Sequence, residues 1–293
     1  MAKRSEVLEA GALERAVQAA ASAAASAGAE VAELRSRDDL RAAADLFVSV
    51  WGARPDGAPI SRDLMRALAH TGNYVTGARR GSELVGASVG FIANGGPEYK
   101  LHSHITGLTP DAQVKGIGFA LKLHQRAWAI ARSLPVISWT FDPLTRRNAY
   151  FNLTKLGAEA SGFLVNFYGQ MDDRLNGGDE TDRCEVTWDL TSERSEAASV
   201  RSLREPELEP LLAAGAVKVL EDRGDGRPRT RAVRGEVRLC WIPADIVALR
   251  STEPDVARSW RLALRDTLGA SIDEGFVASA MTRSGWYVLE HVR

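Results

Sequence analysis

The stretch Thr109–Ala120, which reads TPDAQVKGIGFA, joins a predicted strand to a predicted helix and decides the fold. The strand covers Leu101–Leu108, and the helix runs from about Ile117 to Ser133 with apolar residues along one side. Between them, residues 113–118 read QVKGIG, with two glycines. Glycine lets the backbone approach a ligand without a clash from Cβ, and the unpaired N–H groups of a first helical turn attract phosphate oxygens. The sequence therefore predicts a phosphate-binding loop at the start of this helix.

Two other phosphate-binding patterns do not fit this loop. The dinucleotide fingerprint needs a third glycine three residues after Gly118, where this chain has Leu121. A nucleoside-triphosphate loop ends in Lys followed by Ser or Thr, and the loop lacks that ending. The simplest structural alternative is a helix that merely starts at a glycine turn.

The run Thr109–Ala120 resembles the coenzyme A pyrophosphate motif of the GNAT acetyltransferases, which reads Gln/Arg-x-x-Gly-x-Gly/Ala. The resemblance implies acyl-CoA as co-substrate, either acetyl-CoA or another short acyl-CoA. It also implies that the strand splays after about Leu108 and that an asparagine contacts the pantetheine arm. The family's asparagine aligns nearer Arg146, so Asn148 is the candidate and the exact residue stays open. The cofactor-binding residues predicted in this way are Leu108, Gln113, Val114, Lys115, Gly116, Ile117, Gly118 and Asn148.

Four further stretches resemble a bacterial branch of predicted acetyltransferases that carries a C-terminal extension. With this branch the likeness covers nearly the whole chain. The stretches are Leu101–His104, Trp139–Leu144, Arg147–Ala149 and Asn166–Gly169.

The order of predicted strands and helices indicates a mixed α/β sheet rather than a doubly wound one. The resemblance implies the GNAT fold, in which helices flank a mostly antiparallel central sheet. We expect an alanine-rich leader over residues 1–30, helical or disordered, and a catalytic domain over residues 31–190. A small α/β appendage over residues 200–293 is expected to pack on that domain. Its stretch 221–234, rich in Arg and Gly, is expected to form a mobile loop.

The two histidines before the loop are the candidate bases. Amine acylation needs a neutral amine, and in the GNAT superfamily a carboxylate on this strand often accepts its proton. The resemblance places that position at His102, and His104 lies two residues on, hence on the same strand face. A histidine with a pKa near 6.5 is a competent base at neutral pH, whereas a structural histidine is the alternative. A His-x-His pair also suits zinc, but no third ligand is evident from the sequence, so no metal is expected.

The remaining site candidates come from the resemblance and from their position in the predicted elements. The family's thiolate-protonating tyrosine is missing, since its position falls on Leu153; Tyr150 is the catalytic substitute, unless the thiolate simply leaves to solvent. Tyr168, in the predicted strand 165–168, is a second substitute and a substrate-binding candidate. Asp142 ends a buried strand beside the expected acyl site and is a substrate-binding candidate, with the N-cap of the next helix as the alternative role. Trp51 follows the first helix, at the acceptor cleft of the superfamily.

Composition restricts the kind of protein. The chain has 293 residues with 45% hydrophobic and 26% charged residues, ordinary values for a globular protein. A formal net charge of −1 provides no general attraction to nucleic acid, and two cysteines are too few for a disulfide framework. The sequence has no apolar stretch of bilayer length, and its alanine-rich start lacks a signal peptide's apolar core. We expect a cytoplasmic protein without nucleic acid or membrane partners.

The sequence thus predicts an N-acyltransferase that moves an acyl group from acyl-CoA to a primary amine of a small molecule or amino acid. One alternative keeps the fold but takes a bulkier acyl group from CoA or from a carrier protein. Another is a non-catalytic acyl-CoA-binding sensor. A homodimer remains open.

Overall fold

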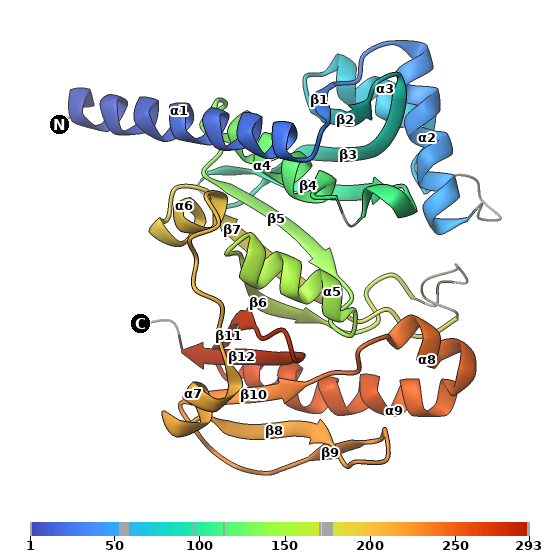
Figure 1. Ribbon diagram of the computed structural model, residues 1–293, viewed down its shortest axis with the longest axis vertical. Coiled ribbons are helices and arrows are strands. Elements are labelled where there is room, and N and C mark those ends of the chain that lie inside the picture. Colours follow the sequence, from blue (N-terminus) through green and yellow to red (C-terminus); the bar gives the residue numbers. More distant parts are fainter. Residues whose placement is uncertain are drawn as a thin grey trace. The chain divides into compact units, whose positions relative to one another are not determined.

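The computed structural model describes residues 2–52, 59–96, 98–113, 115–169, 171 and 178–291, with residues 2–10 described by their backbone alone. Helices and strands follow one another in mixed order (Figure 1). The strands pair mostly antiparallel, and helices flank them, so the predicted fold class is confirmed.

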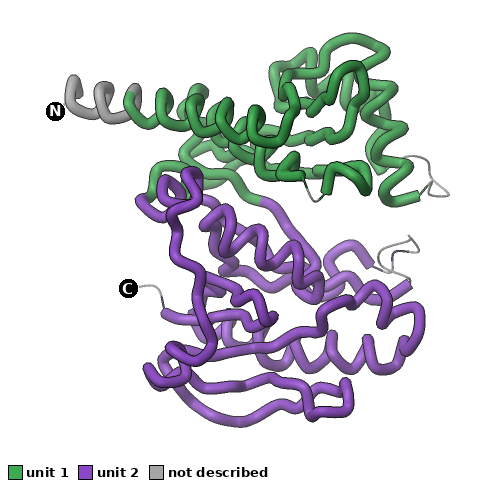
Figure 2. The backbone as a smooth tube through the Cα atoms, in the orientation of Figure 1, with its two compact units in different colours: residues 1–138, 189–192 green, residues 139–188, 193–293 purple. Residues whose placement is uncertain are grey.

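The chain forms two compact units, shown in different colours in Figure 2. The first comprises residues 1–138 and 189–192, and the second comprises residues 139–188 and 193–293. This division passes through strand β5 (Val136–Phe141) rather than between residues 190 and 200. The predicted domain boundaries, which separate a catalytic domain from an appendage, stay a prediction.

In the first unit, strand order is β1-β2-β3-β4-β5, antiparallel except for β4 and β5, which pair in parallel at Leu101 with Ile137 and His102 with Ser138. The elements of this unit, besides the first half of β5, are α1 (Ala2–Ser26), β1 (Glu30–Glu33), α2 (Arg37–Trp51), α3 (Arg62–His70), β2 (Tyr74–Arg80), β3 (Glu83–Asn94), β4 (Tyr99–Leu108), a 3₁₀ turn (Pro110–Ala112) and α4 (Ile117–Ile130).

Helices cover both faces of these strands. The α2 and α3 helices pack on one face, in a core that includes Phe47, Met65 and Val89. On the other face, the Tyr74 hydroxyl lies 3.1 Å from His124 Nδ1 of α4. Ser36 forms the N-cap of α2 as part of a capping box, which fixes where this helix begins.

The alanine-rich leader is a helix. Buried alanines recur along α1 every three to four residues, and the helix packs against α4. Small side chains let the two helices approach closely, so the stretch that looks weakly apolar in sequence is a packing surface. The buried alanines are Ala12, Ala16, Ala19, Ala20, Ala23 and Ala27.

In the second unit, the strand order from β7 onward is β7-β6-β11-β12-β10-β8-β9, with β8 and β10 parallel. Its strands besides the second half of β5 are β6 (Glu159–Leu164), β7 (Arg183–Asp189), β8 (Val217–Asp222), β9 (Pro228–Thr230), β10 (Val237–Trp241), β11 (Phe276–Met281) and β12 (Trp286–His291). Its helices are α5 (Arg146–Ala149), continued by a π-helical segment (Tyr150–Lys155), α6 (Glu193–Ser199), α7 (Leu208–Ala213), α8 (Ile246–Thr252), α9 (Pro254–Leu264), continued by a π-helical segment (Arg265–Gly269), and α10 (Ala270–Asp273).

Two sequence predictions in this unit are wrong. Residues 165–168 form a turn instead of a strand, because Asn166 adopts a left-handed conformation with φ +48° and Gly169 another with φ +71°. The strand precedes it, as β6. The stretch 221–234 contains the end of β8 and all of β9, which pair antiparallel around a turn at Gly224 and Gly226.

Candidate active site

The predicted phosphate-binding loop connects β4 to α4. Gly116 is the N-cap of α4 and has a left-handed backbone with φ 79° and ψ 3°. The N–H groups of a first helical turn have no carbonyl partner within the helix, and the helix dipole adds positive potential there. The first turn of α4 carries no acidic residue, and Gln113 and Lys115 are exposed. This geometry suits a phosphate; Val114 lies outside the described residues.

The two glycines have different structural reasons. The positive φ of Gly116 requires glycine at this position. This requirement would hold even if the helix merely started here and bound no ligand. Gly118 lies inside the first turn of α4 and is not among the residues with positive φ. A helical glycine costs about 1 kcal/mol relative to alanine. Local backbone conformation does not explain Gly118, and close approach of a ligand to the backbone stays a prediction.

A surface cavity of about 340 Å³ lies beside the loop. Its lining includes the basic residues Arg80 and Lys115 and the acidic residues Glu83 and Asp111. With two charges of each sign, the cavity as a whole does not select anions. Anion binding therefore depends on the helix start rather than on this cavity.

His102 and His104 both lie beside Phe91 of β3. The Phe91 ring centroid is 5.1 Å from that of His102 and 5.9 Å from that of His104, and the two imidazoles are 6.3 Å apart. The pairing of β4 with β3 shifts between Ser103 and Ile105, so His104 is the extra residue of a β-bulge. The structure thus brings both candidate bases together, but through a bulge rather than through regular alternation.

The sequence predicts a pKa near 6.5 for His102, and the structure does not agree. Burial, assisted by the neighbouring His104, lowers the pKa of His102 to about 4. The imidazole is neutral at neutral pH, so one of its ring nitrogens can accept a proton, but it is a weaker base than an exposed histidine. His104 is exposed.

Trp51 of α2 packs on one face of the sheet at the end of β4, and Leu108 of β4 lies on the opposite face. A Cβ on Gly107 would lie 2.9 Å from the Trp51 ring and 3.0 Å from the Phe47 ring, so only glycine lets α2 approach β4 here. The side chain of Leu108 lies over Gly86 on the opposite face, where Ile117 and Leu121 of α4 also lie.

Sequence reasoning missed Lys122, a buried lysine on α4. Its Nζ donates to Ser103 Oγ at 2.9 Å and to Gln125 Oε1 at 3.0 Å. Ser103 stands between the two histidines, at the bulge. Burial lowers the pKa of Lys122 to about 7. A lysine within a largely apolar helix is a signal that the sequence offers. Its partner Ser103 is 19 residues away, however, so the sequence does not show the contact.

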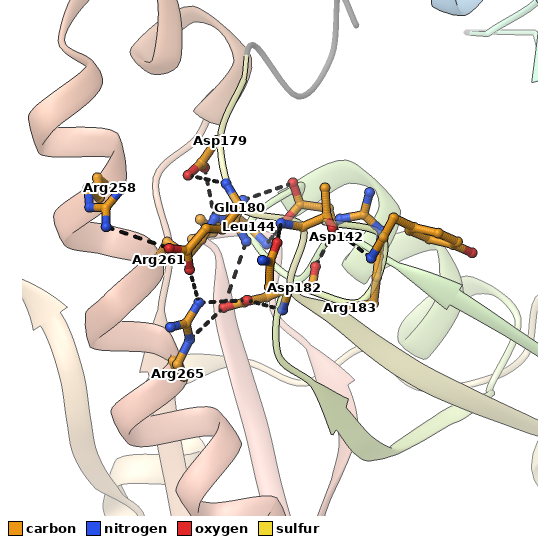
Figure 3. Close-up of polar contacts among 12 residues, drawn as sticks. Asp142, Leu144, Asp179, Glu180, Asp182, Arg183, Arg258, Arg261 and Arg265 are labelled. Atoms are coloured by element: carbon orange, nitrogen blue, oxygen red, sulfur yellow. Dashed lines mark hydrogen bonds and ion pairs between the residues drawn. The ribbon is translucent and has the colours of Figure 1, made fainter. Parts of the chain in front are cut away.

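In the second unit, Asp142 lies in a cluster of ion pairs (Figure 3). Its Oδ1 accepts from the N–H of Leu144 at 3.0 Å, and its Oδ2 accepts from Arg250 at 2.5 Å and lies 3.5 Å from Arg261. Burial raises the pKa of Asp142, but Arg250 and Arg261 outweigh burial and hold that pKa below its ordinary value. The N-cap of α5 is Thr145, so the N-cap alternative for Asp142 is wrong. A substrate-binding role for Asp142 stays a prediction.

Tyr168 lies in the turn after β6. Its hydroxyl is 3.4 Å from Thr140 Oγ1 of β5, and the guanidinium carbon of Arg183 is 5.4 Å from its ring centroid. Asn148 is exposed on α5. Their predicted contacts with substrate and with the pantetheine arm stay predictions.

Tyr150 lies next to the ion pair of Lys155 and Glu205. The Lys155 ammonium is 5.2 Å from the ring centroid, and the Arg283 guanidinium carbon is 5.8 Å from it. Burial raises the pKa of Tyr150, so the phenol is protonated at neutral pH, as a proton donor must be. Its role as the general acid stays a prediction.

Within the described residues, no three or more His, Cys, Asp or Glu side chains gather as metal ligands would. The same part of the chain contains no helix with the length and hydrophobicity needed to cross a bilayer.

A comparison with protein families covers the region that contains the predicted phosphate-binding loop and the two histidines of β4. Residues 12–150 match the family model of the GNAT acetyltransferase domain. This region is similar to the GNAT acetyltransferases, and the match supports an acyl-CoA-dependent acyltransferase. No curated protein sequence matches it.

Solved structures of N-acetyltransferases resemble about half of the chain. The ribosomal-protein-S18-alanine N-acetyltransferase of Escherichia coli is 15% identical; the match covers 56% of this chain and 95% of that one, with a TM-score of 0.45. An N-acetyltransferase of Staphylococcus aureus Mu50 is 15% identical, over 55% and 98% of the two chains, with a TM-score of 0.46. Naa50 of Arabidopsis thaliana, in complex with the bisubstrate analogue CoA-Ac-MVNAL, is 14% identical over 55% and 97%, with a TM-score of 0.42.

Proposed function

We propose that this acyltransferase moves a short acyl group from CoA to the primary amine of a small molecule or an amino acid. The observation that carries the proposal is the start of α4, where Gly118 stands in the first helical turn without a conformational need for glycine. The backbone N–H groups of residues 116–118 would hold the pyrophosphate of CoA, with the exposed Lys115 beside it. When bound, acyl-CoA supplies the thioester that the amine attacks.

His102 is the proposed proton acceptor. During transfer a C–N bond forms, the C–S bond breaks, and the amine loses a proton while the thiol sulfur gains one. An imidazole with a pKa of about 4 cannot deprotonate a free alkylammonium ion in bulk. It can accept the proton late, once the attacking nitrogen has become positively charged and therefore acidic. We infer that the acceptor amine reaches the site neutral, or loses its first proton through water.

Tyr168 and Trp51 are the proposed acceptor contacts, and Tyr150 the proposed donor of a proton to the thiolate. Tyr168 is almost half exposed, at 46%, and its side chain has an aromatic ring and a hydroxyl. An aromatic ring attracts both an ammonium group and an apolar substituent. This combination favours an amine that carries an apolar group.

Acyl-CoA turnover with a panel of primary amines tests the proposal. Native mass spectrometry of the purified protein first identifies the CoA thioester that it binds, and this thioester is then incubated with amino acids, polyamines and aromatic amines. We expect an acylated amine in mass spectrometry and stoichiometric release of free thiol. Tight binding of the thioester without transfer to any amine would contradict the proposal and support the sensor.

A further inference from the structure

The turn that carries Tyr168 is held by buried side chains of the segment before β7. The Asn166 N–H donates to Asp182 Oδ1 at 2.9 Å, and the Tyr168 N–H donates to Thr181 Oγ1 at 2.9 Å. Thr181 in turn donates its N–H to Asn166 Oδ1 at 3.1 Å and its hydroxyl to the Gly169 carbonyl at 2.8 Å. Because Thr181 and Asp182 are fully buried, this backbone conformation is tied to the core of the unit.

The same turn exposes apolar side chains. Val165, Phe167 and Tyr168 are 53%, 50% and 46% exposed, and the two aromatic rings pack edge to face with centroids 4.6 Å apart. Turns usually present polar residues, and exposed apolar patches mark binding surfaces. A rigid backbone under an exposed aromatic pair indicates that the orientation of the pair matters.

The carboxylate of Asp182 is itself fixed by arginines that follow it by about 80 residues. Arg265 contacts both oxygens, with Nε 3.1 Å from Oδ2 and Nη2 2.8 Å from Oδ1, and Arg261 Nη1 lies 4.0 Å from Oδ2 (Figure 3). Arg261 also contacts Asp179 through Nε at 2.8 Å. A buried carboxylate is costly unless cations and hydrogen bonds compensate it, and a two-point guanidinium contact also fixes its orientation.

We propose that Arg265, supported by Arg261, is a positioning residue that acts through Asp182 to hold the turn 166–169 and so orients Tyr168 toward the acceptor. The C-terminal part of the chain then belongs to the acceptor site instead of forming a separate effector. The orienting step stands on the contacts above, whereas the acceptor step rests on the proposed function, in which Tyr168 contacts the amine substrate.

Two variants and one control on the same helical segment test the proposal. Arg265→Met removes the contacts with both Asp182 oxygens but keeps the apolar stem, and Arg265→Lys keeps the charge without the two-point contact. Arg258→Met is the matched control, because Arg258 is 59% exposed and lies 3.5 Å from Glu180. Amide hydrogen exchange at residues 166–168 reports the turn directly, in the full chain and without any substrate.

We expect Arg265→Met to accelerate exchange at residues 166–168 at least tenfold, Arg265→Lys to do so less, and Arg258→Met to leave it unchanged. With an acceptor identified, KM for that acceptor should rise about tenfold in Arg265→Met, while the affinity for CoA stays at the wild-type value. Unchanged exchange in folded Arg265→Met would overturn the positioning role. Faster exchange with an unchanged acceptor KM would overturn the acceptor role of the turn. Tyr168→Ala separates the two steps. An unchanged KM in that variant would show that Tyr168 does not contact the acceptor, so that the proposed function is wrong about Tyr168. The orienting contacts would be unaffected by that result.

Discussion

The predicted phosphate-binding loop and the ion-pair cluster around Asp182 are built in opposite ways. The loop uses the backbone of consecutive residues, and Gly116 and Gly118 leave that backbone accessible because they have no side chain. The cluster uses charged side chains that are far apart in sequence: Asp182 and Arg265 are separated by 83 residues, and Asp142 and Arg250 by 108. A backbone site depends on local conformation, whereas a site of buried charges depends on every long-range contact that brings its members together.

The strand β4, which carries His102 and His104, depends on both local sequence and long-range contacts. His102 and His104 are close in sequence, but burial and the neighbouring His104 set the pKa of His102, and a β-bulge sets the relative placement of the two rings. The comparison therefore predicts that substitutions in the cluster act first on stability, substitutions on the strand act on rate, and substitutions in the loop act on ligand affinity.

The largest effect is expected for Asp182→Ala. The variant leaves the guanidinium groups of Arg261 and Arg265 near one another without their shared carboxylate, and removes the acceptor of the Asn166 N–H. Breaking a buried ion pair costs roughly 3–5 kcal/mol of the free energy of unfolding. Denaturant titration measures this loss. Asp38→Ala is the control, since Asp38 forms an exposed pair with Arg41 at 3.8 Å and should lose less than about 1 kcal/mol. Equal losses in both variants would remove the distinction between buried and exposed charge.

His102→Ala should lower the acylation rate by roughly 10- to 1,000-fold, around the range for loss of a general base, without a change in CoA affinity. His70→Ala, at the end of α3, serves as the control. Single-turnover kinetics and CoA titration measure the two quantities. Normal turnover in His102→Ala would make His102 a structural residue.

The pH dependence of wild-type turnover adds a second test of His102. Its folded pKa of about 4 lies below the ordinary value of 6.5, so the imidazole is neutral from about pH 5 upward. The rate should therefore show no inflection from His102 between pH 6 and 8, and should fall as the pH drops through about 4. An inflection near pH 6.5 that disappears in His102→Ala would show that burial does not shift this group.

Gly118→Asp should lower CoA affinity at least about tenfold, roughly 1.4 kcal/mol, because it places a side chain and a negative charge at the helix start. Gly118→Ala is the matched control: it adds only Cβ, stabilises the helix, and separates steric from electrostatic exclusion. Isothermal titration with CoA measures both. Wild-type affinity in folded Gly118→Asp would mean that CoA does not bind at this loop.

A pH-dependent change of stability is expected for Lys122→Met. The folded pKa of Lys122, about 7, lies below its unfolded value of about 10.5. The unfolded chain therefore binds the proton more readily, and stability rises with pH between these two values. The melting temperature of Lys122→Met relative to wild type should accordingly be highest at about pH 7 and decline toward pH 10. Lys115→Met, at an exposed position, should show no such trend. A difference independent of pH would indicate that Lys122 is not buried as a titrating group.

Most of the first unit could be predicted from the sequence. The strand and helix limits around the loop agree with the structure, because apolar periodicity, the cap at Ser36 and the glycine at 116 are local signals. The failures occur where tertiary contacts decide. Residues 165–168 have the composition of a strand, but Thr181 and Asp182 hold them as a turn. The alanines of α1 carry little hydrophobic signal, and only α4 makes them a packing face.

By itself the sequence determined the class of protein and the place of the glycine-capped helix start that is predicted to bind phosphate, because backbone conformation and helix capping depend on neighbouring residues. The tertiary structure alone decided the protonation state of His102, the burial of Lys122 and the arginine partners of Asp142 and Asp182. The physical reason is that pKa values and buried ion pairs depend on desolvation and on charges brought close by folding. Neither quantity can be read from the residues on either side along the chain.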